Sequence, residues 1–155
     1  GDGVAGTDDG EELRVAFDFD GVLGDDSSER YYRAHGEDLQ VFLEHEAALA
    51  RDPLPPGPLQ PLFAGLAALR NSEPPVAVRL CLVTARSGPA HQRVMATLRS
   101  WGLEMDEAIF LGGGDKTPVL RALRPHIFFD DQEKNLGARA FGIPSVWIPM
   151  SPRDL

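Results

Sequence analysis

Short apolar runs alternate along the chain with longer segments of mixed polarity. Five of these runs have the length and composition of buried strands: residues 13–17, 78–83, 108–111, 126–129 and 145–148. Between them, apolar residues recur at intervals of three and four, which is typical of helices: residues 59–70, 89–101, 117–123 and 132–141. Alternating strands and helices form βαβ units. The pattern therefore predicts an α/β fold with a doubly wound, Rossmann-like parallel sheet of about five strands and helices on both faces.

The segment after the first predicted strand differs from the rest because it is polar and carries no strand pattern. Apolar residues between positions 27 and 51 recur at loosely helical spacing, which predicts two short helices with a break near Gly36. The proline-rich residues 53–58 predict a turn that returns the chain to the sheet. We therefore expect a small helical insertion at about residues 25–56.

The first twelve residues differ in composition from the rest of the chain. Residues 1–12 are rich in glycine and aspartate, which predicts a flexible lead or linker. The remaining residues 13–155 carry enough apolar positions for one core and too few for two. We expect them to form a single domain.

Charge and composition exclude several classes of protein. The formal net charge of −9 and the pI of about 4.8 argue against a nucleic-acid partner, because an acidic surface repels phosphate backbones. The sequence has no run of about 18 apolar residues and no signal-peptide pattern. Its single cysteine, Cys81, lies in an apolar run, so no disulfide forms within the chain. We therefore expect a cytoplasmic protein without a membrane partner.

Two carboxylates follow the first predicted strand, in the segment Phe-Asp-Phe-Asp-Gly-Val. Side chains two residues apart on an extended segment point to the same side, so Asp18 and Asp20 face one small region where the strand ends. Clustered carboxylate oxygens suit a hard cation such as Mg²⁺, and an aspartate can also attack phosphorus. The alternative is a solvated turn in which the acids only cap the next helix.

Three further strand ends carry polar residues, and ligands gather at the carboxyl ends of parallel strands. Thr84 is placed to bind phosphate oxygens or to cap a helix, and Arg86 to reach an anion or to form an ion pair. Lys116 either neutralises a phosphoryl group or is simply solvated. The pair Asp130 and Asp131 either holds a cation or caps a helix. Each residue is a weak signal alone, and only their combination at one edge of the sheet is specific.

The order of these motifs resembles a known superfamily. Asp-x-Asp-Gly-Val, Leu-Val-Thr, Lys and Phe-Phe-Asp-Asp follow one another as do the four motifs of the haloacid-dehalogenase superfamily. The chain is also similar to the cytosolic type I 5′-nucleotidases, from about residue 13 to residue 148. Five stretches carry this more specific similarity: residues 57–59, 82–86, 98–104, 106–111 and 124–131. The resemblance implies the haloacid-dehalogenase fold, with the helical insertion as a small cap over the site.

The resemblance also implies a reaction and a role for each motif residue. Asp18 attacks the phosphorus of a nucleoside 5′-monophosphate and forms an aspartyl-phosphate, and Asp20 acts as general acid and then as general base. Four residues are expected to bind the phosphoryl group: Phe19, Thr84, Ala85 and Lys116. The expected cofactor is Mg²⁺, held by Asp18, the backbone carbonyl of Asp20, Asp131 and, directly or through a neighbour, Asp130.

Some consequences of the resemblance stay open at the level of sequence. Four residues of the insertion are suited to contact a nucleobase, or else pack the insertion itself: Tyr31, Tyr32, Phe42 and His45. The expected partner is a small phosphate ester, a nucleoside monophosphate above all, together with an additional N-terminal half or a homo-oligomer. The alternatives are a phosphatase for another small phosphoester such as a sugar phosphate, and a non-catalytic nucleotide-binding domain.

Overall fold

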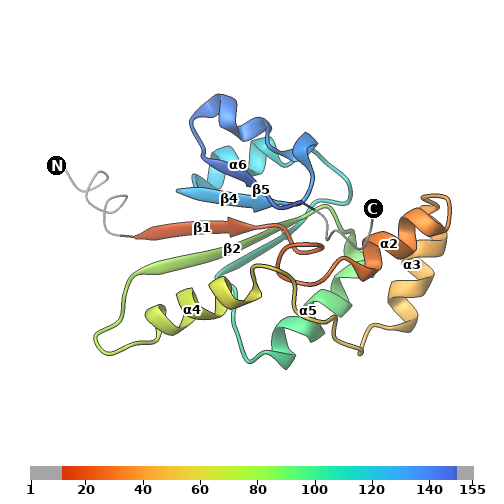
Figure 1. Ribbon diagram of the computed structural model, residues 1–155, viewed down its shortest axis with the longest axis horizontal. Coiled ribbons are helices and arrows are strands. Elements are labelled where there is room, and N and C mark those ends of the chain that lie inside the picture. Colours follow the sequence, from red (N-terminus) through yellow and green to blue (C-terminus); the bar gives the residue numbers. More distant parts are fainter. Residues whose placement is uncertain (1–11, 150–155) are drawn as a thin grey trace.

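The chain folds around a five-stranded sheet in which all strands are parallel, as the computed structural model of residues 12–149 shows (Figure 1). The strands are β1 (Leu13–Phe17), β2 (Val78–Thr84), β3 (Glu107–Phe110), β4 (Ile127–Asp130) and β5 (Ser145–Trp147). Their order in the sheet is β3-β2-β1-β4-β5, so β1 lies at the centre. The predicted α/β fold is confirmed, with strand boundaries within about one residue of those expected. The predicted lead at 1–12 lies, apart from Glu12, outside the described residues.

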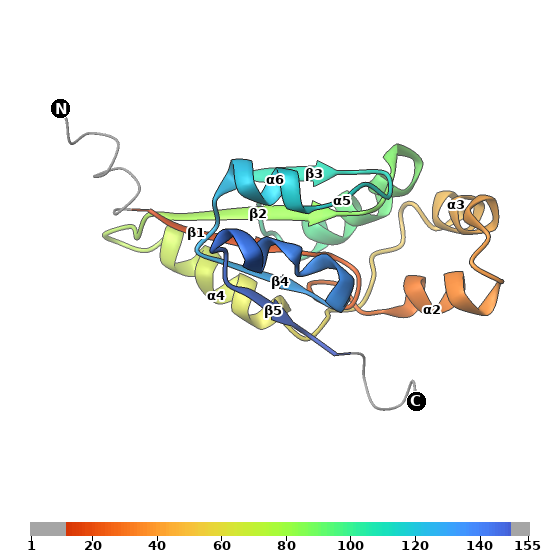
Figure 2. The ribbon, with the colours of Figure 1, turned by 90° about the horizontal axis from the view of Figure 1, so that it is seen from above.

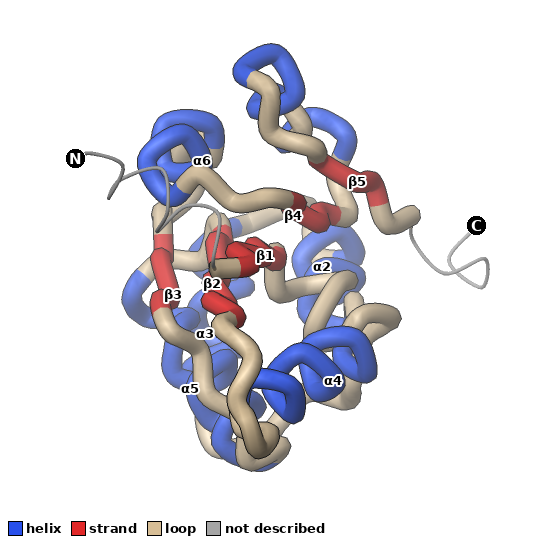
Figure 3. Tube along the Cα trace, turned by 90° about the vertical axis from the view of Figure 1, so that its left-hand side faces the viewer, coloured by secondary structure: helices blue, strands red, loops and turns tan. Residues whose placement is uncertain are grey.

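Helices cover both faces of the sheet, as Figure 3 shows along the strands. Helices α4 (Gln60–Arg70) and α5 (His91–Ser100) pack on one face, and α6 (Thr117–Leu123) packs on the other. Successive strand side chains point to opposite faces, so Phe17 packs toward α4 and α5 while Ala16 packs toward α6. The sheet is therefore doubly wound, as the pattern of the sequence predicts.

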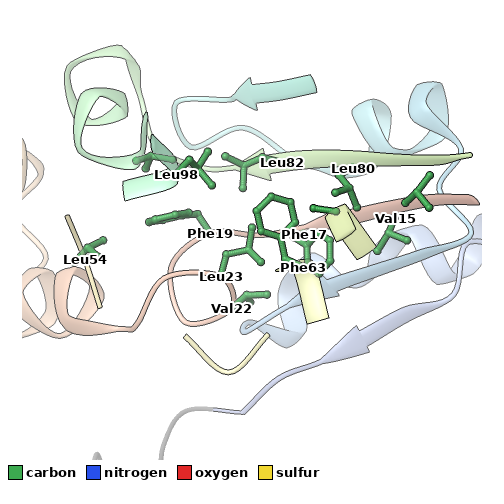
Figure 4. Close-up of a cluster of buried hydrophobic side chains, with 13 residues drawn as sticks. Val15, Phe17, Phe19, Val22, Leu23, Leu54, Phe63, Leu80, Leu82 and Leu98 are labelled. Carbon is green, nitrogen blue, oxygen red and sulfur yellow. The ribbon is translucent and has the colours of Figure 1, made fainter. Parts of the chain in front are cut away.

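The larger core lies between the sheet and helices α4 and α5 (Figure 4). Phe17 is fully buried there, edge-on to Phe63 at 5.9 Å between ring centroids and stacked on Phe129 at 5.5 Å. Such aromatic pairs contribute about 0.5–1.5 kcal/mol beyond the area that they bury. This packing fixes the end of β1, and the residue that follows Phe17 is Asp18.

The helical insertion forms α2 (Ser27–Ala34) and α3 (Leu39–Ala48), beyond the carboxyl ends of the strands (Figure 2). The two helices separate at Gly36, which has φ of +72°, where the sequence predicts the break. Asp38 caps α3, since its side chain accepts a hydrogen bond from the backbone N–H of Val41. The two connections to the core run side by side, and a Cβ on Gly57 would lie 2.2 Å from the carbonyl oxygen of Gly24. Position 57 therefore requires glycine.

The prediction of one α-helix at residues 132–141 is wrong. The segment instead forms two short 3₁₀ helices, η2 (Glu133–Asn135) and η3 (Gly137–Phe141). The Asp130 carboxylate accepts hydrogen bonds from the backbone N–H of Gln132 and the side-chain amide of Asn135, which fixes a tight turn at the start. Gly137 then interrupts the segment with a residue of low helix propensity. A third 3₁₀ turn, η1 (Gly88–Ala90), leads into α5.

Among residues 12–149, no helix combines the length and the apolar character that crossing a membrane requires.

Candidate active site

The first two acids of the site are brought together by the register of the sheet. Phe17 on β1 pairs with Phe129 on β4, and the backbone N–H of Asp18 donates to the carbonyl oxygen of Phe129. Asp18 and Asp130 therefore end neighbouring parallel strands at the same edge. Their side chains alternate with Phe17 and Phe129 and so point to the face that α6 covers.

Lys116 joins these two carboxylates. It lies immediately before α6, and its Nζ is 3.0 Å from Asp18 Oδ1 and 2.6 Å from Asp130 Oδ2. The lysine is 1% exposed, so its charge is almost wholly removed from water. Burial alone would lower the pKa of Lys116, but the charges of Asp18 and Asp130 outweigh burial and raise it. Lys116 is therefore a buried ammonium and not the solvated lysine of the alternative interpretation.

Asp131 completes a group of three buried acids. One carboxylate oxygen from each of Asp18, Asp130 and Asp131 lies within 4.8 Å of the others. Gly21 passes so close that a Cβ there would lie 2.8 Å from Asp131 Oδ2, and its φ of +78° also favours glycine. We call these three aspartates, together with Lys116, the acid cluster.

The acid cluster carries more negative than positive charge. Burial raises the pKa of Asp18 to about 6, and burial with the neighbouring charge of Asp18 raises the pKa of Asp131 to about 10. Their carboxyl oxygens lie within 4.8 Å of one another, so ionisation of one group opposes ionisation of the other. Three acids against one lysine leave an excess that a divalent cation would neutralise, and carboxylate oxygens suit Mg²⁺. The residues present therefore fit this cation.

Asp130 and Asp131 differ in how far their oxygens are already engaged. Asp130 is fully buried, and both of its oxygens accept hydrogen bonds, from Lys116 on one side and from the turn at Gln132 and Asn135 on the other. The backbone carbonyl of Asp131 accepts a hydrogen bond from Trp147 Nε1, which anchors its backbone and not its carboxylate. Asp131 is therefore better placed to offer an oxygen to a ligand.

Three predicted phosphate-binding residues lie around the end of β1 and β2. Thr84 is buried, and its Oγ1 accepts from the backbone N–H of Arg86 at 3.2 Å, while Ala85 is exposed. The Phe19 side chain is fully buried in the core, so only its backbone is available to a ligand, and its N–H donates to Asp18 Oδ1 at 2.8 Å. Phosphate binding by these residues stays a prediction.

Asp20 lies apart from the three aspartates, and its side chain pairs with Arg86. Arg86 Nε and Nη2 donate to the two carboxylate oxygens of Asp20 at 2.8 and 2.6 Å. Such a bidentate pair fixes the plane of the carboxylate as well as its distance. The prediction that Asp20 offers its backbone carbonyl to the metal stays a prediction.

Arg86 reaches the insertion through a residue that the sequence did not single out. Arg86 Nη1 donates to Glu46 Oε1 at 2.6 Å, and Arg93 Nη1 on α5 donates to Glu46 Oε2 at 3.0 Å. Glu46 is 1% exposed although it lies in a polar stretch of α3, and a glutamate among polar residues gives no signal of burial. We call Asp20, Arg86, Glu46 and Arg93 the arginine network.

The four aromatic residues predicted to contact a base pack within the insertion. Tyr31 stacks on His45 at 3.5 Å, and Tyr32 meets Phe42 edge-on at 5.6 Å between ring centroids. All four side chains are only partly buried. Packing of the insertion is thus observed, and contact with a base stays a prediction.

Comparisons with known proteins identify the family of the chain. Residues 3–154 match the model of the protein family described as 5′-nucleotidase. The chain is 43% identical over 139 residues to cytosolic 5′-nucleotidase 1B of Homo sapiens, an alignment that covers 84% of this chain and 22% of that relative. The chain thus spans about a fifth of the curated relative that it matches. No solved structure matches the chain.

Proposed function

The chain belongs to the 5′-nucleotidase family, and on that premise we propose that it is a phosphoric monoester hydrolase that converts nucleoside 5′-monophosphates to nucleosides and inorganic phosphate. The observation that carries this proposal is the acid cluster. Asp18 lies at the end of the central strand, beside a buried lysine and two further acids that suit a divalent cation. A phosphoryl group needs this combination of a nucleophile with positive charge for its oxygens.

In the first step, an Asp18 carboxylate oxygen attacks phosphorus while the bond from phosphorus to the 5′-oxygen breaks. Because Arg86 pairs with the ionised Asp20 carboxylate, Asp20 must take up a proton before this step; it then gives that proton to the 5′-oxygen, and the nucleoside leaves as a neutral alcohol. The backbone N–H of Phe19 and the Lys116 ammonium both contact Asp18 Oδ1. These contacts fix the Asp18 carboxylate in position, which supports its role as the nucleophile. The product of this step is an aspartyl-phosphate on Asp18.

In the second step, water attacks the phosphorus of the aspartyl-phosphate. Asp20 takes the proton of the water, and the bond from phosphorus to the Asp18 oxygen breaks to release phosphate. Lys116 and the Thr84 hydroxyl, with the backbone N–H groups of Phe19 and Ala85, would hold the phosphoryl oxygens in both steps. Lys116 is suited to this role because two carboxylates keep it charged.

Mg²⁺ is the proposed cofactor, held by the Asp18 and Asp131 carboxylates and the backbone carbonyl of Asp20. It would neutralise charge on the phosphoryl oxygens and let the phosphate dianion approach Asp18. Asp130 would act mainly by holding Lys116, since hydrogen bonds engage both of its oxygens. The excess negative charge of the acid cluster supports this assignment.

The helical insertion is proposed to cover the site as a cap. Its position beyond the carboxyl ends of the strands supports this role, because ligands bind at those ends. Tyr31, Tyr32, Phe42 and His45 are the residues of the insertion best suited to stack on a base. The further expectation of an N-terminal half or a homo-oligomer stays a prediction, with which the greater length of the relative is compatible.

The test is release of inorganic phosphate from a panel of nucleoside 5′-monophosphates and sugar phosphates, with Mg²⁺ or with EDTA. We expect metal-dependent release from the nucleotides and a loss of at least about 10⁴-fold in Asp18→Asn, on the scale of a missing nucleophile. Asp115→Asn is the matched control, because Asp115 is an exposed acid at the same edge that only caps the start of α6.

Each other outcome has a distinct meaning. Equal release by the wild type and Asp18→Asn would show that Asp18 is not the nucleophile. A preference for sugar phosphates would replace the proposed substrate with the alternative one. Inertness toward the whole panel would favour a non-catalytic nucleotide-binding domain.

A further inference from the structure

Arg86 lies between the core and the helical insertion and contacts both. Its guanidinium is 5.7 Å from the centroid of the Phe19 ring, which belongs to the core, and 5.5 Å from that of Phe42, which belongs to α3. Its N–H groups bind Asp20 after β1, Glu46 on α3 and the carbonyl oxygen of Ala90. Arg86 is 5% exposed, so protein groups and not water satisfy its charge. One side chain thus touches the proposed proton donor and the insertion at once.

Glu46 in turn is held from several directions. Its Oε1 accepts from Arg86, and its Oε2 accepts from Arg93 on α5 and from the Ser28 hydroxyl on α2 at 3.0 Å. Burial would raise the pKa of Glu46, but the charge and hydrogen bond of Arg86 outweigh burial and lower it. Glu46 is therefore a buried carboxylate whose position is determined by α2, α3 and α5 together.

A displacement of one residue of the arginine network displaces the others, because a buried charge is unstable without a partner. Leaving one member of a buried ion pair unpaired is strongly destabilising. A displacement of α3 that moves Glu46 must therefore move Arg86 or strip it of a partner. Since Arg86 holds both oxygens of Asp20, either event changes the orientation of that carboxylate.

We propose that Arg86 and Glu46 are positioning residues that tie the orientation of the Asp20 carboxylate to the seating of the helical insertion on the core. The inference rests on the proposed function, in which Asp20 gives its proton to the leaving oxygen. The insertion is then more than a cover for the substrate. When α3 is seated, Glu46 holds Arg86, Arg86 holds the Asp20 carboxylate, and the carboxylate that is to receive and give the proton has one orientation.

Substrates with different leaving groups separate this role from binding or folding. A nucleoside 5′-oxygen leaves only with a proton, whereas p-nitrophenolate leaves as an anion and needs none. The parameter to compare is kcat/KM, which covers the steps up to departure of the leaving group. In Arg86→Lys and Glu46→Gln we expect kcat/KM for a nucleoside 5′-monophosphate to fall at least about 10²-fold, and that for p-nitrophenyl phosphate to change less than about 3-fold.

Two further variants complete the set. Ser28→Ala removes one hydrogen bond from Glu46 and keeps every charge, so it should shift the ratio of the two kcat/KM values in the same direction by a smaller factor and remain folded. Glu107→Gln is the control, because Glu107 forms an ion pair with Arg79 on strand β2, at the opposite end of the strands from the acids. Glu107→Gln should leave kcat/KM unchanged for both substrates.

Equal losses for both substrates would overturn the proposal, because they would assign Arg86 to the phosphoryl group or to the fold alone. Hydrogen exchange provides a readout without catalysis: Glu46→Gln should speed exchange of the backbone amides at 18–24, and Glu107→Gln should not. Unchanged exchange there would also overturn the coupling. Faster exchange in Glu46→Gln together with a wild type that releases no phosphate would contradict the proposed function and the role in proton donation. The coupling between the insertion and the segment at 18–24 would then still hold.

Discussion

The acid cluster and the arginine network are two buried groups of charges that adjoin at the end of β1, and they differ in balance. The acid cluster has three carboxylates and one ammonium. The arginine network has two carboxylates, Asp20 and Glu46, and two guanidinium groups, Arg86 and Arg93. Asp18 and Asp20 lie two residues apart and belong to different groups.

This difference in charge balance distinguishes a candidate ligand-binding site from a group of ion pairs that stabilises the fold. In the arginine network, the charges satisfy one another, and the pKa of Glu46 is lowered by its partners. In the acid cluster, burial and the neighbouring charge of Asp18 raise the pKa of Asp131 to about 10. A buried group that stays under-neutralised destabilises the fold and is typical of positions selected for function. This difference supports the proposal that a cation and a phosphate bind at the acid cluster.

Among single substitutions, the largest expected change in the free energy of unfolding distinguishes the arginine network from the acid cluster. Glu46→Ala removes the carboxylate that pairs with the buried Arg93 and leaves Arg86 with Asp20 alone, so the free energy of unfolding should fall by about 3–5 kcal/mol. Asp131→Ala removes a repelled acid, so it should leave the metal-free protein as stable as the wild type or more stable. Urea denaturation in EDTA measures both. A large loss of stability in both variants would remove the distinction.

Binding of Mg²⁺ should distinguish the groups next. At a Mg²⁺ concentration of about 100 times Kd, a site present only in the folded state adds about 2.7 kcal/mol to the free energy of unfolding. We expect this gain in the wild type and in Ser28→Ala, and its loss in Asp131→Asn. Thermal denaturation with and without EDTA measures the gain. An equal response of Asp131→Asn would place the cation elsewhere.

The dependence of stability on pH should be dominated by the acid cluster when no metal is present. Because the pKa of Asp131 rises from 3.8 to about 10 on folding, the folded state keeps a proton that the unfolded state releases. The free energy of unfolding should therefore fall as pH rises from about 4 toward 10, by up to about 1.4 kcal/mol per pH unit. Asp18, with its pKa raised to about 6, adds to this slope below pH 6.

Asp131→Asn tests this assignment directly, because asparagine does not titrate. Urea denaturation at several pH values in EDTA should give a flatter profile for Asp131→Asn than for the wild type. An unchanged slope would assign the titration to other groups.

The smallest effect expected is that of one hydrogen bond in the arginine network. Ser28→Ala removes the hydroxyl that donates to Glu46 Oε2, which should lower the free energy of unfolding by about 0.5–1.5 kcal/mol. Ser27 is the matched control, since it is the exposed neighbour and its hydroxyl binds Asp25 in the same connection. Ser27→Ala should cost less than Ser28→Ala in urea denaturation, and the reverse order would show that Glu46 does not depend on Ser28.

Much of the fold could be predicted because it follows from local patterns. Apolar runs of four to six residues, separated by segments with helical periodicity, are sufficient to predict the order of strands and helices and a parallel sheet. The segment at 132–141 was predicted incorrectly because its conformation depends on Asp130, whose carboxylate takes up the N–H of Gln132 and the amide of Asn135. The spacing of apolar residues within the segment gives no information about hydrogen bonds to a side chain at the end of the preceding strand.

The sequence alone determined that acids, a threonine and a lysine come to one edge of the sheet, because parallel strands must end together. It also determined the helical insertion and the break near Gly36. Only the tertiary structure decided the partners: that Asp18 joins Asp130, Asp131 and Lys116, while Asp20 turns to Arg86. It alone showed that Glu46 is buried. The physical reason is that spacing along a strand sets which edge a side chain reaches, whereas pairing of buried charges depends on elements distant in the sequence.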